Sequence, residues 1–292
     1  MTYDYHLVDV FTQRALEGNA LAVFTDATGM TDETMQAIAR EMNLSETSFI
    51  LPEASAPSHT RVRIFTPTYE MTFAGHPTIG TAYVMRRQGL VEPHVRTLTL
   101  AENVGRVEVR IDEGDDPRIW LTTPPIATVR RFDPADCARA LTLQPDDLIT
   151  GIPCELLSAG NPCIFVPLRD PATVDRAEVD ANAYRDLVAS REQTTCLFPF
   201  APVARGAYAR MFSPELGIVE DPATGSATGP LAAFMMRYGL VRSEDGTTFV
   251  SEQGTKMRRR SLLHVRIRGD GGSAGIDVGG HVTYVAHGRL TL

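Results

Sequence analysis

Three ionisable side chains lie in short segments whose composition suits acid and base chemistry, and the first is His76. It lies between Gly75 and Pro77 in FAGHPTIGTA (73–82), a stiff turn that leads into a segment of helix-forming composition. The N-terminal end of a helix is the positive end of its dipole, so we expect a lowered pKa for His76. A neutral imidazole can donate a hydrogen bond or pass a proton. A single histidine is more often structural, however, and His76 alone does not define a site.

The other two side chains are carboxylates. Asp221 precedes Pro222 in EDPATGSA (220–227), where an aspartate is also a common helix N-cap. Glu46 lies in NLSET (43–47), between a predicted helix and a predicted strand, where a carboxylate is ordinarily solvated. A carboxylate at the mouth of a cleft with a raised pKa would instead be a competent general base and then acid near neutral pH. The residues alone leave both interpretations open.

The chain contains two similar segments, which indicates a duplication. FTPTYEMTFAGHPTIGTAYVMRRQGLV (65–91) and FSPELGIVEDPATGSATGPLAAFMMRYGLV (212–241) begin with the same F-[ST]-P and end with the same R-x-G-L-V. Between these ends, GHPTIGTA aligns with EDPATGSA at the proline, the glycine and the alanine, with an offset of 145 residues. This alignment places Asp221 opposite His76, so both copies would carry an ionisable group at the same turn.

The offset is about half of the 292 residues, so we predict two domains, residues 1–126 and residues 127–281. Each copy has an extended segment, a turn with proline and glycine, and then a helix of small residues, predicted at 78–89 and 225–239. Both helices are apolar on nearly every side, which is typical of helices buried within a sheet structure. Much of the remaining sequence has the composition of strands. We therefore predict an α+β fold in which each domain is a sheet wrapped on one buried helix.

The N-terminal ends of these two helices could bind a small carboxylate. If the domains face each other across a cleft, the free amides and the positive dipole ends of both helices would point into it. Gly75, Gly225 and Ser226 would let the backbone approach the ligand closely, and the Ser226 hydroxyl would add a donor. The alternative is that the glycines only permit close packing of a buried helix, and composition does not decide between the two.

The net charge, the apolar runs and the counts of cysteine and histidine argue against several classes of partner. With 28 basic and 36 acidic side chains and a net charge of −8, the chain repels phosphate backbones, so we expect no nucleic-acid binding. It has no run of roughly 18 apolar residues and no basic N-terminal region before an apolar run, so we expect a cytoplasmic protein that does not enter a membrane. Its four cysteines lack a C-x-x-C spacing and its seven histidines lack close pairs. We therefore expect reduced, mostly buried thiols and no metal.

Three of these segments together resemble the signatures of a known family. NLSET with Glu46, FAGHPTIGTA with His76 and EDPATGSATGPLAAF with Asp221 are similar, in this order, to the motifs of the PhzF family of phenazine-biosynthesis-type isomerases. VDVFT and GNALAVF near the N-terminus and GGHVTYVAHGRLTL at the C-terminus are similar as well, so the resemblance extends over essentially the whole chain. It implies the diaminopimelate epimerase-like fold, with two pseudo-symmetric domains, each a curved sheet or barrel around a central helix. It also implies a site between the domains and a last strand, about 282–292, that returns to the first domain.

The resemblance further implies an activity. The prototype isomerises trans-2,3-dihydro-3-hydroxyanthranilate, a small conjugated carboxylate, without cofactor or metal, and the resemblance suggests a homodimer. By the motif match, Glu46 would remove a proton from one ring carbon and return it to another on the same face, while His76 and Asp221 hold and polarise the substrate. The implied contacts to the substrate carboxylate come from the backbone of Gly75, Gly225 and Ser226 and, as a less specific match in SAGNP, from Gly160.

Two other functions stay open. An amino-acid or hydroxy-acid epimerase or racemase could use Glu46 and Asp221 on opposite faces of the α-carbon, and a non-catalytic relative could keep the cleft only to bind a ligand. The same fold houses epimerases that use two cysteines, but neither turn here contains a cysteine, so inversion by two thiols is disfavoured. Solvent-deuterium incorporation with or without inversion separates the two reactions, and binding without proton exchange would indicate the third function.

Overall fold

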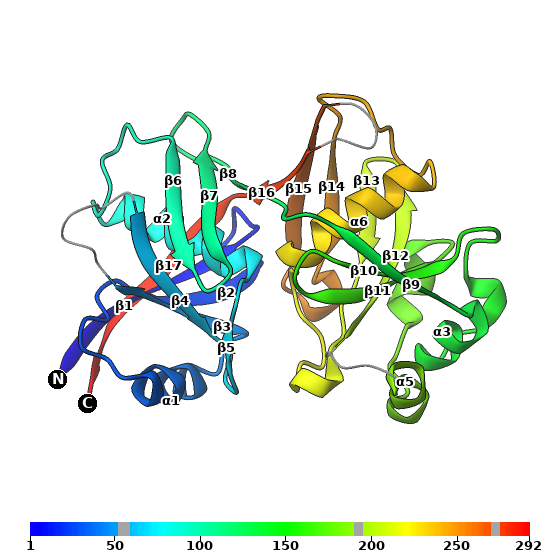
Figure 1. Cartoon of the computed structure of the whole chain (residues 1–292), viewed down its shortest axis with the longest axis horizontal. Coiled ribbons are helices and arrows are strands. Elements are labelled where there is room, and N and C mark those ends of the chain that lie inside the picture. Colours follow the sequence, from blue (N-terminus) through cyan, green and yellow to red (C-terminus); the bar gives the residue numbers. More distant parts are fainter. Residues whose placement is uncertain (52–58, 190–194, 270–274) are drawn as a thin grey trace. The chain divides into compact units, whose positions relative to one another are not determined.

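The structure is a computed structural model that describes residues 1–51, 59–189, 195–269 and 275–292 (Figure 1). The chain divides into two compact units: unit 1 comprises Met1–Thr122 with Gly279–Leu292, and unit 2 comprises Thr123–Val278. Both units consist mainly of strands with a smaller number of helices, which is the predicted α+β composition.

Unit 1 is a mixed sheet that contains both antiparallel and parallel pairs. Its strands and helices are β1 (Thr2–Val10), β2 (Asn19–Phe24), β3 (Glu46–Leu51), β4 (His59–Phe65), β5 (Glu70–Met71), β6 (Thr97–Glu102), β7 (Gly105–Ile111), β8 (Ile119–Thr122), β17 (Val282–Thr291), α1 (Asp32–Met42) and α2 (Gly75–Arg87). β1 pairs antiparallel with β17 and β2, β2 parallel with β3, β3 antiparallel with β4, and β4 parallel with β6. β7 and β8 then follow as antiparallel neighbours. β17 lies along β1, so the two ends of the chain lie side by side in this unit (Figure 1).

Helix α2 is buried against the sheet of unit 1. Its Ile79, Ala82 and Val84 have no exposed surface. Gly80 approaches β1 and β2 so closely that a Cβ atom added there would lie 2.5 Å from Leu21 Cδ2. The small residues of this helix are therefore required by the close approach of the sheet. The helix ends just before Gly89, whose φ of +68° is the left-handed conformation expected at a glycine stop.

Unit 2 repeats this order of strand pairs. Its elements are β9 (Ala127–Phe132), α3 (Pro134–Ala140), η1 (Pro145–Asp147), β10 (Cys154–Ser158), β11 (Pro162–Pro167), α4 (Pro171–Arg176), α5 (Ala181–Val188), β12 (Cys196–Val203), β13 (Gly206–Ala209), η2 (Pro214–Leu216), α6 (Gly225–Arg237), β14 (Thr248–Gln253), η3 (Thr255–Met257) and β15 (Ser261–Arg268). β9, β10 and β11 pair antiparallel, β11 pairs parallel with β12, β12 antiparallel with β13, β13 parallel with β14, and β14 antiparallel with β15. β16 (Gly275–Gly280) contains the point at which the chain passes from unit 2 to unit 1.

Helix α6 occupies the place in unit 2 that α2 occupies in unit 1. Its Leu231, Phe234 and Met235 are fully buried, and a Cβ atom added at Gly229 would collide with the side chain of Thr123. Both helices are therefore buried, as their composition predicts. Across the described ranges, no helix is long and apolar enough to cross a membrane.

The two helices correct the alignment of the two copies. Both are 13 residues long, they begin at Gly75 and Gly225, and the offset between them is therefore 150 residues rather than 145. His76 and Ser226 are each the second residue of their helix, whereas Asp221 lies four residues before α6. The sequence alignment matched two prolines in different settings, because Pro77 lies inside the first turn of α2 and Pro222 lies before α6. A proline is tolerated in a first turn, where its missing N–H costs no hydrogen bond, so the predicted start at residue 78 was three residues late.

The prediction of four reduced cysteines was wrong for two of them. Cys163 and Cys196 form a disulfide, while Cys137 and Cys154 are buried free thiols. The two bonded residues face each other in the register of the parallel pair β11 and β12, with their Cα atoms 4.5 Å apart. Their separation of 33 residues follows no motif, so only the strand pairing brings them together.

Candidate functional site

Glu46 and His76 meet in unit 1, although 30 positions separate them in the sequence. Glu46 is the first residue of β3 and His76 the second residue of α2, and their Oε2 and Nε2 atoms are 3.3 Å apart. Both side chains are nearly buried, with exposed fractions of 11% for Glu46 and 5% for His76. The solvated loop position that is the ordinary expectation for Glu46 is therefore wrong, because the strand begins at this residue and turns its side chain inward.

Asn19 holds the imidazole from its other side. Its amide nitrogen, Nδ2, lies 3.3 Å from His76 Nδ1, and the side chain of Asn19 is buried at the start of β2. An amide nitrogen only donates, so Nδ1 of His76 accepts and carries no proton. In a neutral imidazole the proton is then on Nε2, the atom that faces Glu46. Asn19 thus sets the tautomer that directs an N–H group at the carboxylate.

His76 is neutral at physiological pH. Burial lowers the pKa of His76 to about 3, so the 3.3 Å contact brings a neutral imidazole to the Glu46 carboxylate and is not an ion pair. The predicted direction of the pKa shift is confirmed. Its cause differs from the expected one. The position of His76 at a helix end predicted a lowered pKa through the helix dipole, whereas burial of the imidazole lowers it in the structure.

The first turn of α2 presents backbone donors beside this pair. Ala74 is the N-cap in an extended conformation and its side chain offers no capping oxygen. Gly75 and His76 are the first two residues of the helix, and Pro77 brings no N–H at the third position. The amides at this helix end are those of Gly75 and His76, and Gly75 has no side chain to keep a ligand away from them.

In unit 2, Asp221 lies buried in front of helix α6. Its Oδ2 accepts a hydrogen bond from Thr224 Oγ1 at 2.5 Å, and its carbonyl oxygen accepts one from Gln253 Nε2 at 2.7 Å. The residue before it, Glu220, is held by Arg210 in a bidentate pair with distances of 2.9 and 2.8 Å. The Asp221 carboxylate is therefore held by Thr224 and its backbone by Gln253, which suits a group that orients a ligand.

The other candidates of unit 2 gather at the start of α6. Gly225 and Ser226 are its first two residues, and the Ser226 hydroxyl accepts a hydrogen bond from Asn161 Nδ2 at 3.3 Å. Gly160, which precedes Asn161, has a φ of +114° in the turn between β10 and β11. This conformation favours glycine, so Gly160 shapes the turn that carries Asn161 to the helix.

Asn19 and Asn161 were not predicted, although the sequence contains a signal for them. The dipeptide Gly-Asn occurs at 18–19, just before the second strand of unit 1, and at 160–161, just before the corresponding strand β11. Each asparagine contacts the second residue of its buried helix, His76 in one unit and Ser226 in the other. Comparing the whole of the two copies, rather than only the segments around the helices, would have found this repeat.

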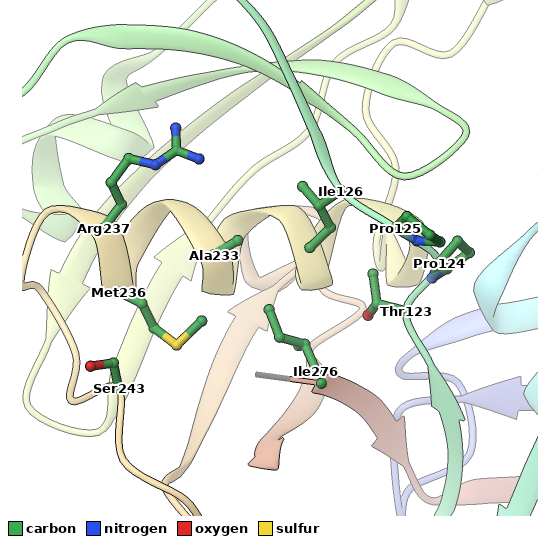
Figure 2. A pocket seen from close by; sticks show the side chains of 10 residues that line it. Thr123, Pro124, Pro125, Ile126, Ala233, Met236, Arg237, Ser243 and Ile276 are labelled. Carbon is green, nitrogen blue, oxygen red and sulfur yellow. The ribbon is translucent and has the colours of Figure 1, made fainter. Parts of the chain in front are cut away.

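A pocket of about 450 Å³ lies elsewhere in unit 2. Its lining includes Thr123, Ile126 and Ile276 together with the C-terminal half of α6, as Figure 2 shows. The Arg237 side chain extends away from Met236 in that view, and its guanidinium binds Glu155 at 2.9 Å. None of the seven candidate residues lines this pocket, so it is separate from them. In the portion of the chain that the structure describes, no cluster of three or more His, Cys, Asp or Glu side chains could hold a metal ion.

The chain is similar to known proteins over its full length. The family model for phenazine biosynthesis-like protein, PhzC-PhzF, matches residues 8–288. The trans-2,3-dihydro-3-hydroxyanthranilate isomerase of Pseudomonas aeruginosa is 34% identical over 297 residues, which cover 99% of each chain. The crystal structure of a PhzF-family phenazine biosynthesis protein from Bacillus anthracis has a TM-score of 0.89 at 27% identity and covers 100% of each chain.

A probable proline racemase from Agrobacterium radiobacter, at 13% identity, has a TM-score of 0.69 and covers 99% of this chain and 93% of its own. This second likeness concerns the fold alone. Together the structural neighbours confirm the predicted α+β, diaminopimelate epimerase-like fold. The chain therefore belongs to the PhzC-PhzF family of phenazine biosynthesis-like proteins, whose members include isomerases.

Proposed function

We propose that this chain isomerises a small conjugated carboxylate by moving one proton, with Glu46 as the group that removes and returns it. The observation that carries the proposal is the buried pair of Glu46 and His76, in which a neutral imidazole directs its Nε2–H at the carboxylate. A carboxylate shielded from water is a stronger base than a solvated one, and a fixed N–H donor beside it can stabilise charge that develops on the substrate.

The proton moves in two steps that use the same residue. Glu46 takes the proton from one carbon, which leaves a delocalised anion, and it then returns the proton to a second carbon of the conjugated system. The His76 N–H lies beside Glu46 and, once Glu46 is protonated, donates to an oxygen of the anion. No change of charge on His76 is needed, which agrees with its pKa of about 3.

We assign the remaining candidates to substrate binding. The amides of Gly75, Gly225 and Ser226 are at helix ends that favour an anion, and Asp221 is a fixed carboxylate able to accept from an amino or hydroxyl group of the ligand. Gly160 acts through its neighbour Asn161. Asp221→Asn is expected to raise KM more than it lowers kcat, whereas an equal fall of kcat and kcat/KM would place Asp221 in the proton transfer.

Proton NMR of trans-2,3-dihydro-3-hydroxyanthranilate in deuterated buffer tests the reaction. We choose this substrate because it is the one that the Pseudomonas aeruginosa relative is named for. Wild type and the matched control Glu41→Gln, which removes an exposed carboxylate at the end of α1, are expected to convert it, and Glu46→Gln is not. Conversion by Glu46→Gln would refute the role of Glu46.

A different result would be that wild type does not convert this probe and instead exchanges the α-proton of amino or hydroxy acids with inversion at the α-carbon. That result would refute the isomerase function and indicate an epimerase. Ligand binding without any proton exchange would indicate a relative that has lost the reaction. The family resemblance also suggests a homodimer that needs no cofactor. Light scattering of the purified chain tests the dimer, and turnover after dialysis against EDTA tests the independence from metal.

A further inference from the structure

A buried carboxyl group that the proposed reaction does not use lies behind helix α2. It is Glu102, the last residue of β6, with an exposed fraction of 4%. Its Oε1 lies 2.6 Å from the hydroxyl of Thr78, and its Oε2 is buried with no hydrogen-bond partner among the described residues. A carboxylate in such a place would be costly, because one of its oxygens has neither water nor a donor.

The contacts of Thr78 determine whether Thr78 or Glu102 donates the proton in the hydrogen bond between them. Thr78 Oγ1 lies 2.7 Å from the carbonyl oxygen of Ala74 as well as 2.6 Å from Glu102 Oε1. A hydroxyl has one proton and a carbonyl oxygen can only accept, so the Thr78 proton goes to Ala74. The short contact to Glu102 is then a hydrogen bond only if Glu102 donates, that is, if it is a neutral carboxylic acid. Burial raises the pKa of Glu102 to about 8 and outweighs the lowering effects of Thr78 and Arg61, so the neutral acid is the main form at pH 7.

Unit 2 has a neutral donor at the corresponding place. Gln253 is the last residue of β14, as Glu102 is of β6, and each strand forms an antiparallel pair with the next one. In unit 2, Thr228 Oγ1 donates to the carbonyl oxygen of Thr224 at 3.0 Å, the counterpart of the bond from Thr78 to Ala74. Gln253 Nε2 donates to Thr224 Oγ1 at 2.9 Å. Glutamine has the shape of a protonated glutamate, so both units hold the start of the buried helix with a neutral side chain that donates a hydrogen bond.

We propose that Glu102 is a positioning residue for the His76 turn, acting as a neutral acid whose hydrogen bond to Thr78 fixes the Ala74 carbonyl at the start of α2. His76 lies between Ala74 and Thr78, so the hydrogen bond from the Thr78 hydroxyl to the Ala74 carbonyl holds the turn that places the imidazole beside Glu46. The effect on turnover rests on the proposed function, whereas the protonation of Glu102 and its effect on His76 do not.

The groups around Glu102 give its ionisation a defined consequence. Arg61 of β4 is the charged side chain that acts on it, and the Arg61 guanidinium donates to the Ala101 carbonyl oxygen and to Asn103. From α2 the facing group is the uncharged Thr78, and the register partner on β7 is Gly105. When Glu102 ionises, the Thr78 hydroxyl must turn to the carboxylate and release Ala74. The His76 turn then loses one of its hydrogen bonds, and turnover falls as pH rises.

The variant Glu102→Gln tests the proposal, with Glu108→Gln as the matched control. Glu108 is an exposed carboxylate on β7, the strand paired with β6. The pH 7 rate of wild type is expected to fall about tenfold by pH 9, following the loss of the protonated fraction of a group with a pKa about 8. Glu102→Gln is expected to keep the pH 7 rate within about twofold and to show no such fall, while Glu108→Gln follows wild type. A Glu102→Gln variant with the wild-type fall would overturn the proposal.

A second measurement does not depend on any substrate. In protein with ¹⁵N-labelled histidine, the His76 signals of wild type are expected to shift between pH 7 and pH 9 and those of Glu102→Gln to stay constant. The signals of the exposed His94 serve as the reference in each sample. In ¹³C-labelled protein, the Glu102 carboxyl is expected to titrate near pH 8, and titration near pH 4.5 would refute the proposal. If the His76 and Glu102 results hold while no substrate is converted, the proposed function fails and the positioning role stands.

Discussion

Replacing Glu102 by glutamine should change the stability of the protein in a way that depends on pH. The pKa of a glutamate in the unfolded chain is near 4.5, and in the folded protein burial raises that of Glu102 to about 8. Below pH 4.5 the group is protonated in both states and contributes nothing to the difference. Between pH 4.5 and pH 8 the folded state binds a proton that the unfolded state has lost, so the free energy of unfolding falls as pH rises.

The size of the effect follows from the difference between the two pKa values. Each unit corresponds to 1.36 kcal/mol, so the full difference is about 5 kcal/mol above pH 8, a large share of the stability of a typical domain. Glu102 is buried, so screening by solvent does not reduce this value much. Glu102→Gln keeps the shape and the donor but has no proton to lose. It should therefore become more stable than wild type as pH rises from 5 to 9, by up to about 4 kcal/mol relative to the difference at pH 5.

Urea unfolding at each pH unit from 5 to 9 measures this difference. Groups that titrate in both proteins cancel when the two free energies are subtracted, and Glu108→Gln shows the effect of removing an exposed carboxylate. A difference between Glu102→Gln and wild type that does not change with pH would mean that Glu102 is ionised in the folded protein. The Thr78 hydroxyl would then donate its proton to Glu102 and not to Ala74.

Four further predictions concern the His76 pair and the packing around the two helices. His76 should remain neutral from pH 5 to pH 9, seen as constant ¹⁵N shifts in Glu102→Gln, because burial lowers its pKa to about 3; protonation near pH 6 would show that the site is open to water. Asn19→Asp should move the imidazole proton to Nδ1 and lower turnover about a hundredfold, since the N–H that faces Glu46 is lost; an unchanged tautomer in the ¹⁵N spectrum would contradict this. Gly80→Ala should destabilise by about 1–3 kcal/mol in urea unfolding, because its methyl group would meet Leu21, and an unchanged midpoint would show that α2 can move away. Arg210→Met should cost about 3–5 kcal/mol by leaving Glu220 buried without its guanidinium, and the added change Glu220→Gln should recover part of this loss.

The sequence was informative where a single segment determines the structure. The apolar composition of α2 and α6 and the glycines at 89 and 239 predicted two buried helices and their ends. The starts of the helices were less predictable, because Pro77 is compatible with a first turn as well as with the extended chain before it. The same ambiguity produced the wrong pairing of His76 with Asp221, which the helix bounds replace by His76 and Ser226.

The contacts within the candidate site come from strand pairing and could not be predicted from spacing. Glu46 reaches His76 because β3 and α2 pack together, and Cys163 reaches Cys196 because β11 and β12 are parallel and in register. Asn19 is an intermediate case, since the repeated Gly-Asn marks it but its bond to His76 depends on the fold. The electrostatic environment also comes from packing: burial of His76, rather than its place at a helix end, is what lowers its pKa.

The differences between the two units bear on which of them would carry the proposed proton transfer. Glu46 faces Leu21 in the register of β2 and β3, and Leu21 lies two residues after Asn19. By the same count in unit 2, Cys163 lies two residues after Asn161 and faces Cys196, so the position of Glu46 is taken there by a cysteine in a disulfide.

The other corresponding positions follow the same trend, with His76 against Ser226 and Glu102 against Gln253. At these three positions the group in unit 1 can titrate or pass a proton, and its counterpart in unit 2 cannot do so near neutral pH. A duplicated frame with a base in one copy only favours removal and return of the proton by Glu46 on one face of the substrate. Inversion would require Asp221, whose counterpart in unit 1 at the same offset is Met71, to act as the second base. If wild type retains the configuration at the carbon that exchanges its proton for deuterium, a single base is supported. Inversion at that carbon would assign Asp221 as the second base.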